Sequence, residues 1–117
     1  MPNVPMNISN IIDEFINGVN NILMDRVKKI ILYGSYARGD YNESSDIDIM
    51  ILTDLTDDEM YDYFVKISDM AYDIEEKNNF DISLSPLVKN IDKFNYWLKA
   101  LPFYMNVQRE GVVLSEF

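Results

Sequence analysis

Two short apolar runs, residues 27–33 (VKKIILY) and 47–52 (IDIMIL), restrict the fold more than any other feature of the sequence. Each is rich in β-branched residues and is too short for a buried helix, so each predicts a strand. Three successive apolar residues in the first run, Ile30, Ile31 and Leu32, are typical of a strand that is buried on both faces. The first strand is therefore predicted to lie in the core.

Segments with helical or strand periodicity surround these two runs. Helices are predicted over residues 8–24, 56–78, 90–101 and 103–109. The second of these helices begins with a capping-box pattern, in which Thr56 is followed three residues later by Glu59. Residues 80–87 alternate apolar and polar side chains, which predicts a third strand with Asp81 on its polar face, and residues 111–114 predict a last short strand. Strands that alternate with helices indicate an α/β fold.

Length and composition limit the classes of protein that the chain can belong to. The 117 residues leave room for one domain, which we expect to span residues 1–117. The absence of cysteine excludes disulfides and thiolate metal sites, and without histidine any catalysis must use carboxylates, hydroxyls, lysine, arginine or a hard metal ion. No apolar run is long enough to span a membrane, and the N-terminus lacks a signal-peptide pattern, so we expect a cytoplasmic protein.

The formal net charge of −10 bears on the partners of the protein. A basic groove for DNA or RNA is not expected in such a chain, because nucleic-acid binding depends on lysine and arginine at the phosphates. An acidic surface suits a basic protein partner or divalent cations, although acidity can also serve solubility alone.

Two aspartates stand two residues apart at the start of the second predicted strand. Side chains at positions i and i+2 of a strand point to the same face, so Asp46 and Asp48 share one face while Ile47 and Ile49 occupy the other. Like charges so close together repel, and a Mg²⁺ ion between the carboxylates would remove that cost. The alternative is an exposed strand face whose charges prevent edge-to-edge pairing. The two aspartates alone leave both interpretations open.

The turn that follows the first strand favours the metal interpretation. Gly34-Ser35 precedes a predicted helical turn, where backbone N–H groups can bind an anion and glycine lets a phosphate approach the backbone. Arg38 could neutralise phosphate charge, although it could equally pair with Asp40 on the surface. A phosphate-binding turn beside a carboxylate pair predicts a site for a nucleoside triphosphate.

These motifs resemble a known family. Gly34-Ser35, followed about ten residues later by Asp46-x-Asp48, is similar to the signature of the DNA polymerase β-like nucleotidyltransferase superfamily, and residues 34–52 (GSYARGDYNESSDIDIMIL) resemble its minimal nucleotidyltransferases. Residues 80–86 (FDISLSP) resemble the third strand of that family, and residues 105–114 (MNVQREGVVL) resemble its closing segment. The resemblance implies a small mixed β-sheet with helices packed mainly on one face, as in the polymerase β palm.

The resemblance also implies a site and a chemistry. Three carboxylates would be both the catalytic residues and the ligands of two Mg²⁺ ions: Asp46, Asp48 and Asp81. The phosphates of the nucleotide would be bound by Gly34, Ser35 and Arg38. An acceptor hydroxyl would then attack the α-phosphorus of ATP, and the protein would contribute mainly positioning and charge neutralisation.

The acceptor is the least determined part of this prediction. Some proteins of the family resemble antitoxins that transfer AMP to a tyrosine of a HEPN-domain ribonuclease toxin, so a HEPN-type toxin is the partner that the resemblance implies. One alternative is transfer to a small molecule such as an aminoglycoside. Another is an antitoxin that neutralises its toxin by binding alone, which clustered like charges argue against.

Overall fold

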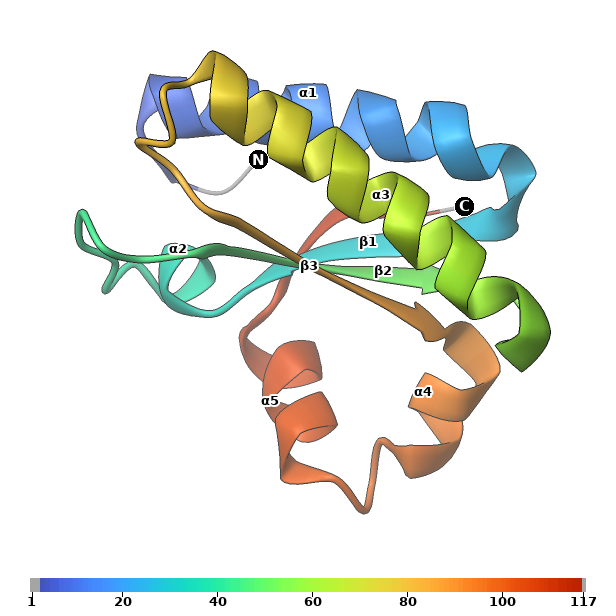
Figure 1. The fold of residues 1–117 in the computed structure, drawn as a ribbon. Coiled ribbons are helices and arrows are strands. Elements are labelled where there is room, and N and C mark those ends of the chain that lie inside the picture. Colours follow the sequence, from blue (N-terminus) through green and yellow to red (C-terminus); the bar gives the residue numbers. More distant parts are fainter. Residues whose placement is uncertain (1–2, 117) are drawn as a thin grey trace.

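Four strands form one mixed sheet in the order β3–β2–β1–β4 in the computed structural model, which describes residues 3–116 (Figure 1). Their bounds are β1 Val27–Tyr33, β2 Ile47–Thr53, β3 Leu84–Asn90 and β4 Val112–Glu116. β1 pairs antiparallel with both β2 and β4, whereas β2 pairs parallel with β3. The mixed sheet that was predicted is confirmed, and residues 1, 2 and 117 of the expected domain lie outside the described residues.

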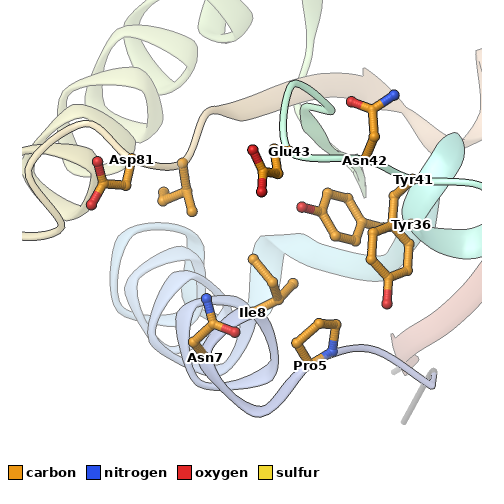
Figure 2. A pocket seen from close by; sticks show the side chains of 9 residues that line it. Pro5, Asn7, Ile8, Tyr36, Tyr41, Asn42, Glu43 and Asp81 are labelled. Carbon is orange, nitrogen blue, oxygen red and sulfur yellow. The ribbon is translucent and has the colours of Figure 1, made fainter.

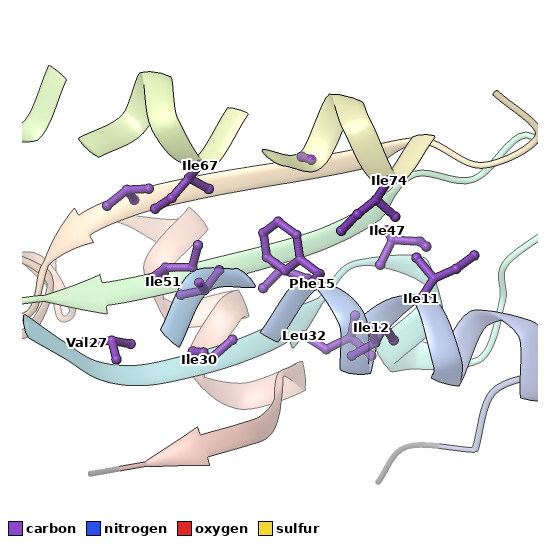
Figure 3. Close-up of a cluster of buried hydrophobic side chains, with 14 of the residues drawn as sticks. Ile11, Ile12, Phe15, Val27, Ile30, Leu32, Ile47, Ile51, Ile67 and Ile74 are labelled. Carbon is purple, nitrogen blue, oxygen red and sulfur yellow. The ribbon is translucent and has the colours of Figure 1, made fainter. Parts of the chain in front are cut away.

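The two long helices, α1 (Met6–Leu23) and α3 (Asp57–Lys77), cover one face of the sheet (Figure 1). Between these helices and the sheet lies the main core, in which Phe15, Ile30 and Ile51 are completely buried (Figure 3). Burial of each such side chain stabilises the fold by about 1.5–3 kcal/mol. The expected helical layer is present on this face, and the longest helices of the described residues form it.

The opposite face of the sheet is covered by two short helices, α4 (Ile91–Trp97) and α5 (Pro102–Glu110). A second cluster of buried side chains joins them to the sheet: Ile31, Met50, Leu52, Phe94 and Val107. β1 and β2 therefore carry buried side chains on both faces, as the continuous apolar run in β1 predicts. One predicted helix over residues 90–101 is shorter than expected, and Pro102 starts α5 instead of continuing α4.

The start of α3 is fixed by the capping box that its sequence predicts. The Thr56 N–H donates to Oε1 of Glu59 over 3.0 Å, and the Glu59 N–H lies 3.1 Å from the Thr56 carbonyl. Arg26, at the end of the 3₁₀ turn η1 (Met24–Arg26), donates two hydrogen bonds to the Glu59 carboxylate, of 2.9 and 2.7 Å, and one of 2.6 Å to Asp54. These contacts tie the segment before β1 to the segment after β2.

The third strand lies later in the sequence than predicted, and this is a correction. It runs from Leu84 to Asn90 instead of residues 80–87, because Asn79 and Phe80 adopt left-handed backbone angles that end α3 in a turn (φ 56° and 57°). Asp81 consequently lies in the connection before β3 and not on the polar face of a strand. None of the helices between residues 3 and 116 combines the length and apolarity needed to cross a bilayer.

Candidate functional site

The antiparallel register of β1 and β2 brings the glycine turn to the aspartate pair. Tyr33, the last residue of β1, is opposite Asp48, so Gly34 leaves the sheet beside the Asp48 side chain. A β-carbon on residue 34 would overlap Oδ2 of Asp48 and would lie 3.2 Å from its Cγ. Gly34 also has φ of 77°, a region that other residues rarely adopt. The backbone and the carboxylate can approach this closely only because residue 34 is glycine.

Gly34 begins a single helical turn, α2 (Ser35–Arg38). Its carbonyl accepts the N–H groups of Ala37 and Arg38, at 3.1 and 3.0 Å. The turn ends at Gly39, which is left-handed (φ 90°) and donates its N–H to the Ser35 carbonyl. The first N–H groups of such a turn have no partner within it, so they are available to an anion.

One cavity of about 330 Å³ gathers most of the predicted site residues. Its lining residues from the sheet and the turn are Tyr33, Gly34, Ser35, Arg38 and Asp48. The facing wall is α5, which contributes Phe103, Asn106, Val107 and Glu110. The sequence predicts this helix but not its place in the site. The available signals are the apolar spacing from Phe103 to Val107 and the resemblance of residues 105–114 to the closing segment of the family.

The Asp48 carboxyl experiences both burial and a like charge. Burial raises its pKa above the ordinary value, and the neighbouring Asp46 raises it further, whereas a hydrogen bond with Ser85 and the charge of Arg38 act in the opposite direction. Ser85 stands opposite Asp48 in the parallel pairing of β2 with β3. The neighbouring Tyr33 hydroxyl has a pKa raised to about 12, first by burial and then by the charge of Asp48. A cation near Asp48 would therefore relieve an existing electrostatic cost.

Arg38 lies in the cavity and pairs with two carboxylates. Its Nε donates to Asp40 over 3.2 Å, as the surface-pair alternative predicts, and its Nη1 lies 3.5 Å from Oε2 of Glu110. Glu110 lines the same cavity, whereas Asp40 does not. An acidic side chain is thus present in the cavity where a phosphate was predicted.

A comparison with known protein families identifies the fold and the enzyme class. The family model described as "Nucleotidyltransferase domain" matches residues 12–111, most of the chain. The chain belongs to the nucleotidyltransferase-domain family. The predicted enzyme class, nucleotidyltransferase, is confirmed, and the cavity at the glycine turn is the candidate active site of this nucleotidyltransferase.

Individual relatives agree with this assignment. The chain is 38% identical over 109 residues to the Methanocaldococcus jannaschii protein named "Putative protein adenylyltransferase MJ0604", a match that covers 93% of this chain and 99% of the relative. The crystal structure of a "putative nucleotidyltransferase from Sulfolobus solfataricus" has a TM-score of 0.63 at 18% identity, over 92% of this chain and 78% of that one.

Two further solved structures are toxin–antitoxin complexes. One, named MntA-HpeT, matches with a TM-score of 0.53 at 17% identity, over 87% of this chain and 71% of that one. The other, a "toxin-antitoxin with AMP-PNP", matches with a TM-score of 0.50 at 20% identity, over 88% and 72%. At these identities, the likeness is one of fold.

The three predicted carboxylates do not all line the cavity at the glycine turn. Only Asp48 is part of its lining. Asp46 is exposed just before β2, close enough to raise the pKa of Asp48. Asp81 is exposed and lines a different cavity, beside Tyr36 and Tyr41. Within residues 3–116, no three acidic, histidine or cysteine side chains are grouped as metal ligands would be. The role of Asp81 stays a prediction.

Asp46 and Asp48 nevertheless fit a magnesium ion. Mg²⁺ binds through oxygen ligands, usually one or two carboxylates together with water and substrate phosphates. The cavity offers the Asp48 carboxylate and the Ser35 hydroxyl, and Asp46, which is not part of the lining, lies close enough to raise the pKa of Asp48. All three side chains are hard oxygen donors. The donor set matches Mg²⁺ and does not suit a soft metal.

Proposed function

We propose that this nucleotidyltransferase transfers AMP from ATP to a hydroxyl group on a protein partner, and that it works in the cytoplasm as the antitoxin of a HEPN-type ribonuclease. The proposal that the protein binds ATP rests on one observation. A single cavity is lined by Gly34, Ser35, Arg38 and Asp48. This combines donors for phosphate oxygens with a carboxylate whose pKa is raised by burial and by the neighbouring Asp46. A site for a plain anion would have no use for Asp48, and a site for a plain cation would have no use for the glycine turn.

The chain's own residues bind and orient the triphosphate in this proposal. The Ser35 hydroxyl and the first N–H groups of α2 hold the terminal phosphates, and Arg38 neutralises part of their charge. The acceptor oxygen forms a bond to the α-phosphorus while the bond from the α-phosphorus to the bridging oxygen breaks, so pyrophosphate leaves and the acceptor proton is released. Gly34 keeps the backbone close enough for these contacts.

Asp46 and Asp48 would hold Mg²⁺, with Asp81 as a proposed third ligand and two ions as the proposed number. When bound, the metal supplies positive charge that stabilises the leaving pyrophosphate and lowers the pKa of the acceptor hydroxyl. Asp81 is also a proposed acceptor for the hydroxyl proton, in a chain without histidine.

The acceptor is inferred from relatives and from charge. A relative that matches over almost its full length is named "Putative protein adenylyltransferase MJ0604", and two structures with the same fold are toxin–antitoxin complexes, one with AMP-PNP. A net charge of −10 suits a basic, RNA-binding partner. AMP on a tyrosine near the nuclease site would put negative charge where RNA phosphates bind, and so block cleavage.

The test separates transfer from binding. A candidate HEPN toxin is incubated with ATP, Mg²⁺ and either the wild type or Asp48→Asn, the small protein is removed, and RNA cleavage and intact mass are measured. Toxin treated with the wild type should gain the mass of AMP on a tyrosine and stay inactive, whereas toxin treated with the variant should recover.

Two results would refute the proposal in different ways. Full recovery of both toxin samples would make the protein a masking antitoxin that acts by binding. If the toxin gains no mass while an aminoglycoside acquires AMP under the same conditions, the acceptor is a small molecule.

A further inference from the structure

A second cavity, of about 530 Å³, lies on the α1 side of the turn α2 (Figure 2). It is bounded by the start of α1, the loop that follows Gly39 and the connection before β3. The turn α2 separates it from the nucleotide cavity, because Ser35 lines one cavity and the next residue, Tyr36, lines the other. The proposed reaction uses none of its residues except Asp81.

One wall of this cavity is aromatic. The rings of Tyr36 and Tyr41 are stacked, with centroids 4.5 Å apart and planes inclined by 15°, and Figure 2 shows them side by side on that wall. Only 8% of the Tyr36 surface is exposed. Its hydroxyl forms no hydrogen bond within residues 3–116 and keeps some contact with solvent. The rings keep one another in place, which leaves an outer face for a ligand.

The remaining lining combines apolar surface with negative charge. Pro5, Ile8 and Ile82 supply the apolar part. The Glu43 carboxylate turns into the cavity, whereas that of Asp81, at the far rim, turns outward (Figure 2). Within residues 3–116, neither carboxylate forms an ion pair. The cavity therefore offers uncompensated negative charge next to aromatic and aliphatic surface.

We propose that this cavity binds an arginine side chain of the protein acceptor. Arginine has an aliphatic stem that packs on apolar side chains and a planar cation that stacks on tyrosine and pairs with carboxylates, and these are the groups that Ile8, Tyr41 and Glu43 present. The identity of the partner rests on the proposed function. The site deepens that function by naming a feature through which the acceptor is recognised.

The place of the cavity explains how such recognition would serve transfer. A partner residue anchored beside Tyr36 lies on the other side of one helical turn from Ser35, so the partner surface is fixed next to the nucleotide cavity. Positioning of two reactants in this way lowers the entropic part of the barrier.

The test uses small probes and the whole chain. N-acetyl-arginine amide and its neutral isostere N-acetyl-citrulline amide are titrated into ¹⁵N-labelled protein. The arginine probe should shift the amide signals of Tyr41, Glu43 and Ile82 and bind about fivefold more tightly than citrulline, as expected for an exposed ion pair with a cation–π contact. Glu43→Gln should remove that preference. Asp62→Asn, which deletes the same charge at an exposed site on α3, should retain it.

Four outcomes would overturn the arginine site. In the first two, the arginine and citrulline probes bind equally well, or Glu43→Gln keeps the preference for arginine. In the third, ATP and Mg²⁺ shift the signals of Tyr41 and Glu43 and arginine does not. In the fourth, an aminoglycoside binds this cavity in preference to arginine. ATP with Mg²⁺ in the same samples tests the proposed function separately, through the signals of Gly34 and Ser35. If ATP shifts those signals and arginine shifts none, only the arginine site is refuted; if arginine binds and ATP does not, the nucleotide proposal fails and the cation site stands.

Discussion

The carboxylate of Asp48 lies so close to Cα of Gly34 that no β-carbon fits between them. The pairing of Tyr33 with Asp48 at the end of β1 and β2 produces this contact, and φ of 77° at Gly34 directs the chain into α2 from the same point. The glycine turn at Gly34 and the Asp48 carboxylate are therefore one structural unit, and a change in either should disturb the other.

Gly34→Ala should lower both stability and ATP affinity. The backbone angles of Gly34, φ 77° and ψ −156°, lie in a region almost confined to glycine, which costs a residue with a β-carbon about 1–3 kcal/mol, and the overlap with Asp48 adds to that cost. Thermal melts and ATP titrations measure the two effects. The double variant Gly34→Ala/Asp48→Ala removes the overlap, so it should regain part of the lost stability while still failing to transfer AMP. A wild-type melting temperature for Gly34→Ala would mean that the contact is not constrained.

Asp48→Asn should abolish transfer yet make the metal-free protein more stable at neutral pH. Because burial and Asp46 raise the pKa of Asp48 in the folded state, its contribution to stability is fully present below the unfolded pKa, near 3.9, and is lost as the pH rises through the folded pKa. The amide avoids that loss. Melting temperatures of wild type and variant should therefore converge in acid and separate toward neutrality, with the variant higher. A difference in melting temperature that stays constant with pH, or a variant that is less stable than the wild type at pH 7, would contradict this prediction.

The sequence predicts the interior of this fold better than its connections. The sequence predicts β1 with its observed bounds, because a continuous apolar run is a strong local signal, and the Thr56–Glu59 capping box fixes the start of α3. The prediction of the third strand over residues 80–87 is wrong because it rests on alternating polarity, which an extended connection can also show. Left-handed angles at Asn79 and Phe80 delay the strand to Leu84. The asparagines at 78 and 79 indicate that the helix ends there, because asparagine adopts such angles readily, but no residue type predicts the left-handed angle at Phe80.

The same limit applies to the site. The grouping of Gly34, Ser35, Arg38 and Asp48 follows from motifs within 15 residues of sequence, and the structure brings these residues together. The neighbours Ser85 and Glu110 come from distant elements, and their contacts depend on strand register and on how α5 packs. A contact of this kind depends on two segments that are far apart in the sequence, so the sequence of either segment alone does not predict it.

Arg26→Met should make the fold less stable at neutral pH. It should also reduce the loss of stability that the wild type undergoes when Glu59 is protonated in acid. The Arg26 guanidinium lowers the pKa of Glu59 to about 2 through its hydrogen bonds, so the stability that Glu59 provides is present above its ordinary value of 4.5 and is lost as the pH falls toward 2. In the variant, the melting temperature should fall less steeply over that range. Lys28→Met is the matched control, because Lys28 pairs with Asp54 at 3.6 Å and donates to the Asp25 carbonyl, and forms no ion pair with Glu59. Parallel pH profiles for wild type and Arg26→Met would refute the assignment.

Glu110→Gln should increase the affinity for ATP about two- to fivefold, the range expected for release of a partly exposed ion pair. Glu110 places a negative charge in the cavity and pairs with Arg38, so it competes with the triphosphate for the same guanidinium. Asp40→Asn removes an equal charge and another partner of Arg38, but from outside the cavity, and should change the affinity less. The difference between the two variants should shrink at high salt, because screening weakens the repulsion that Glu110 exerts on the phosphates. Weaker ATP binding by Glu110→Gln would mean instead that Glu110 holds Arg38 in the orientation that phosphate requires.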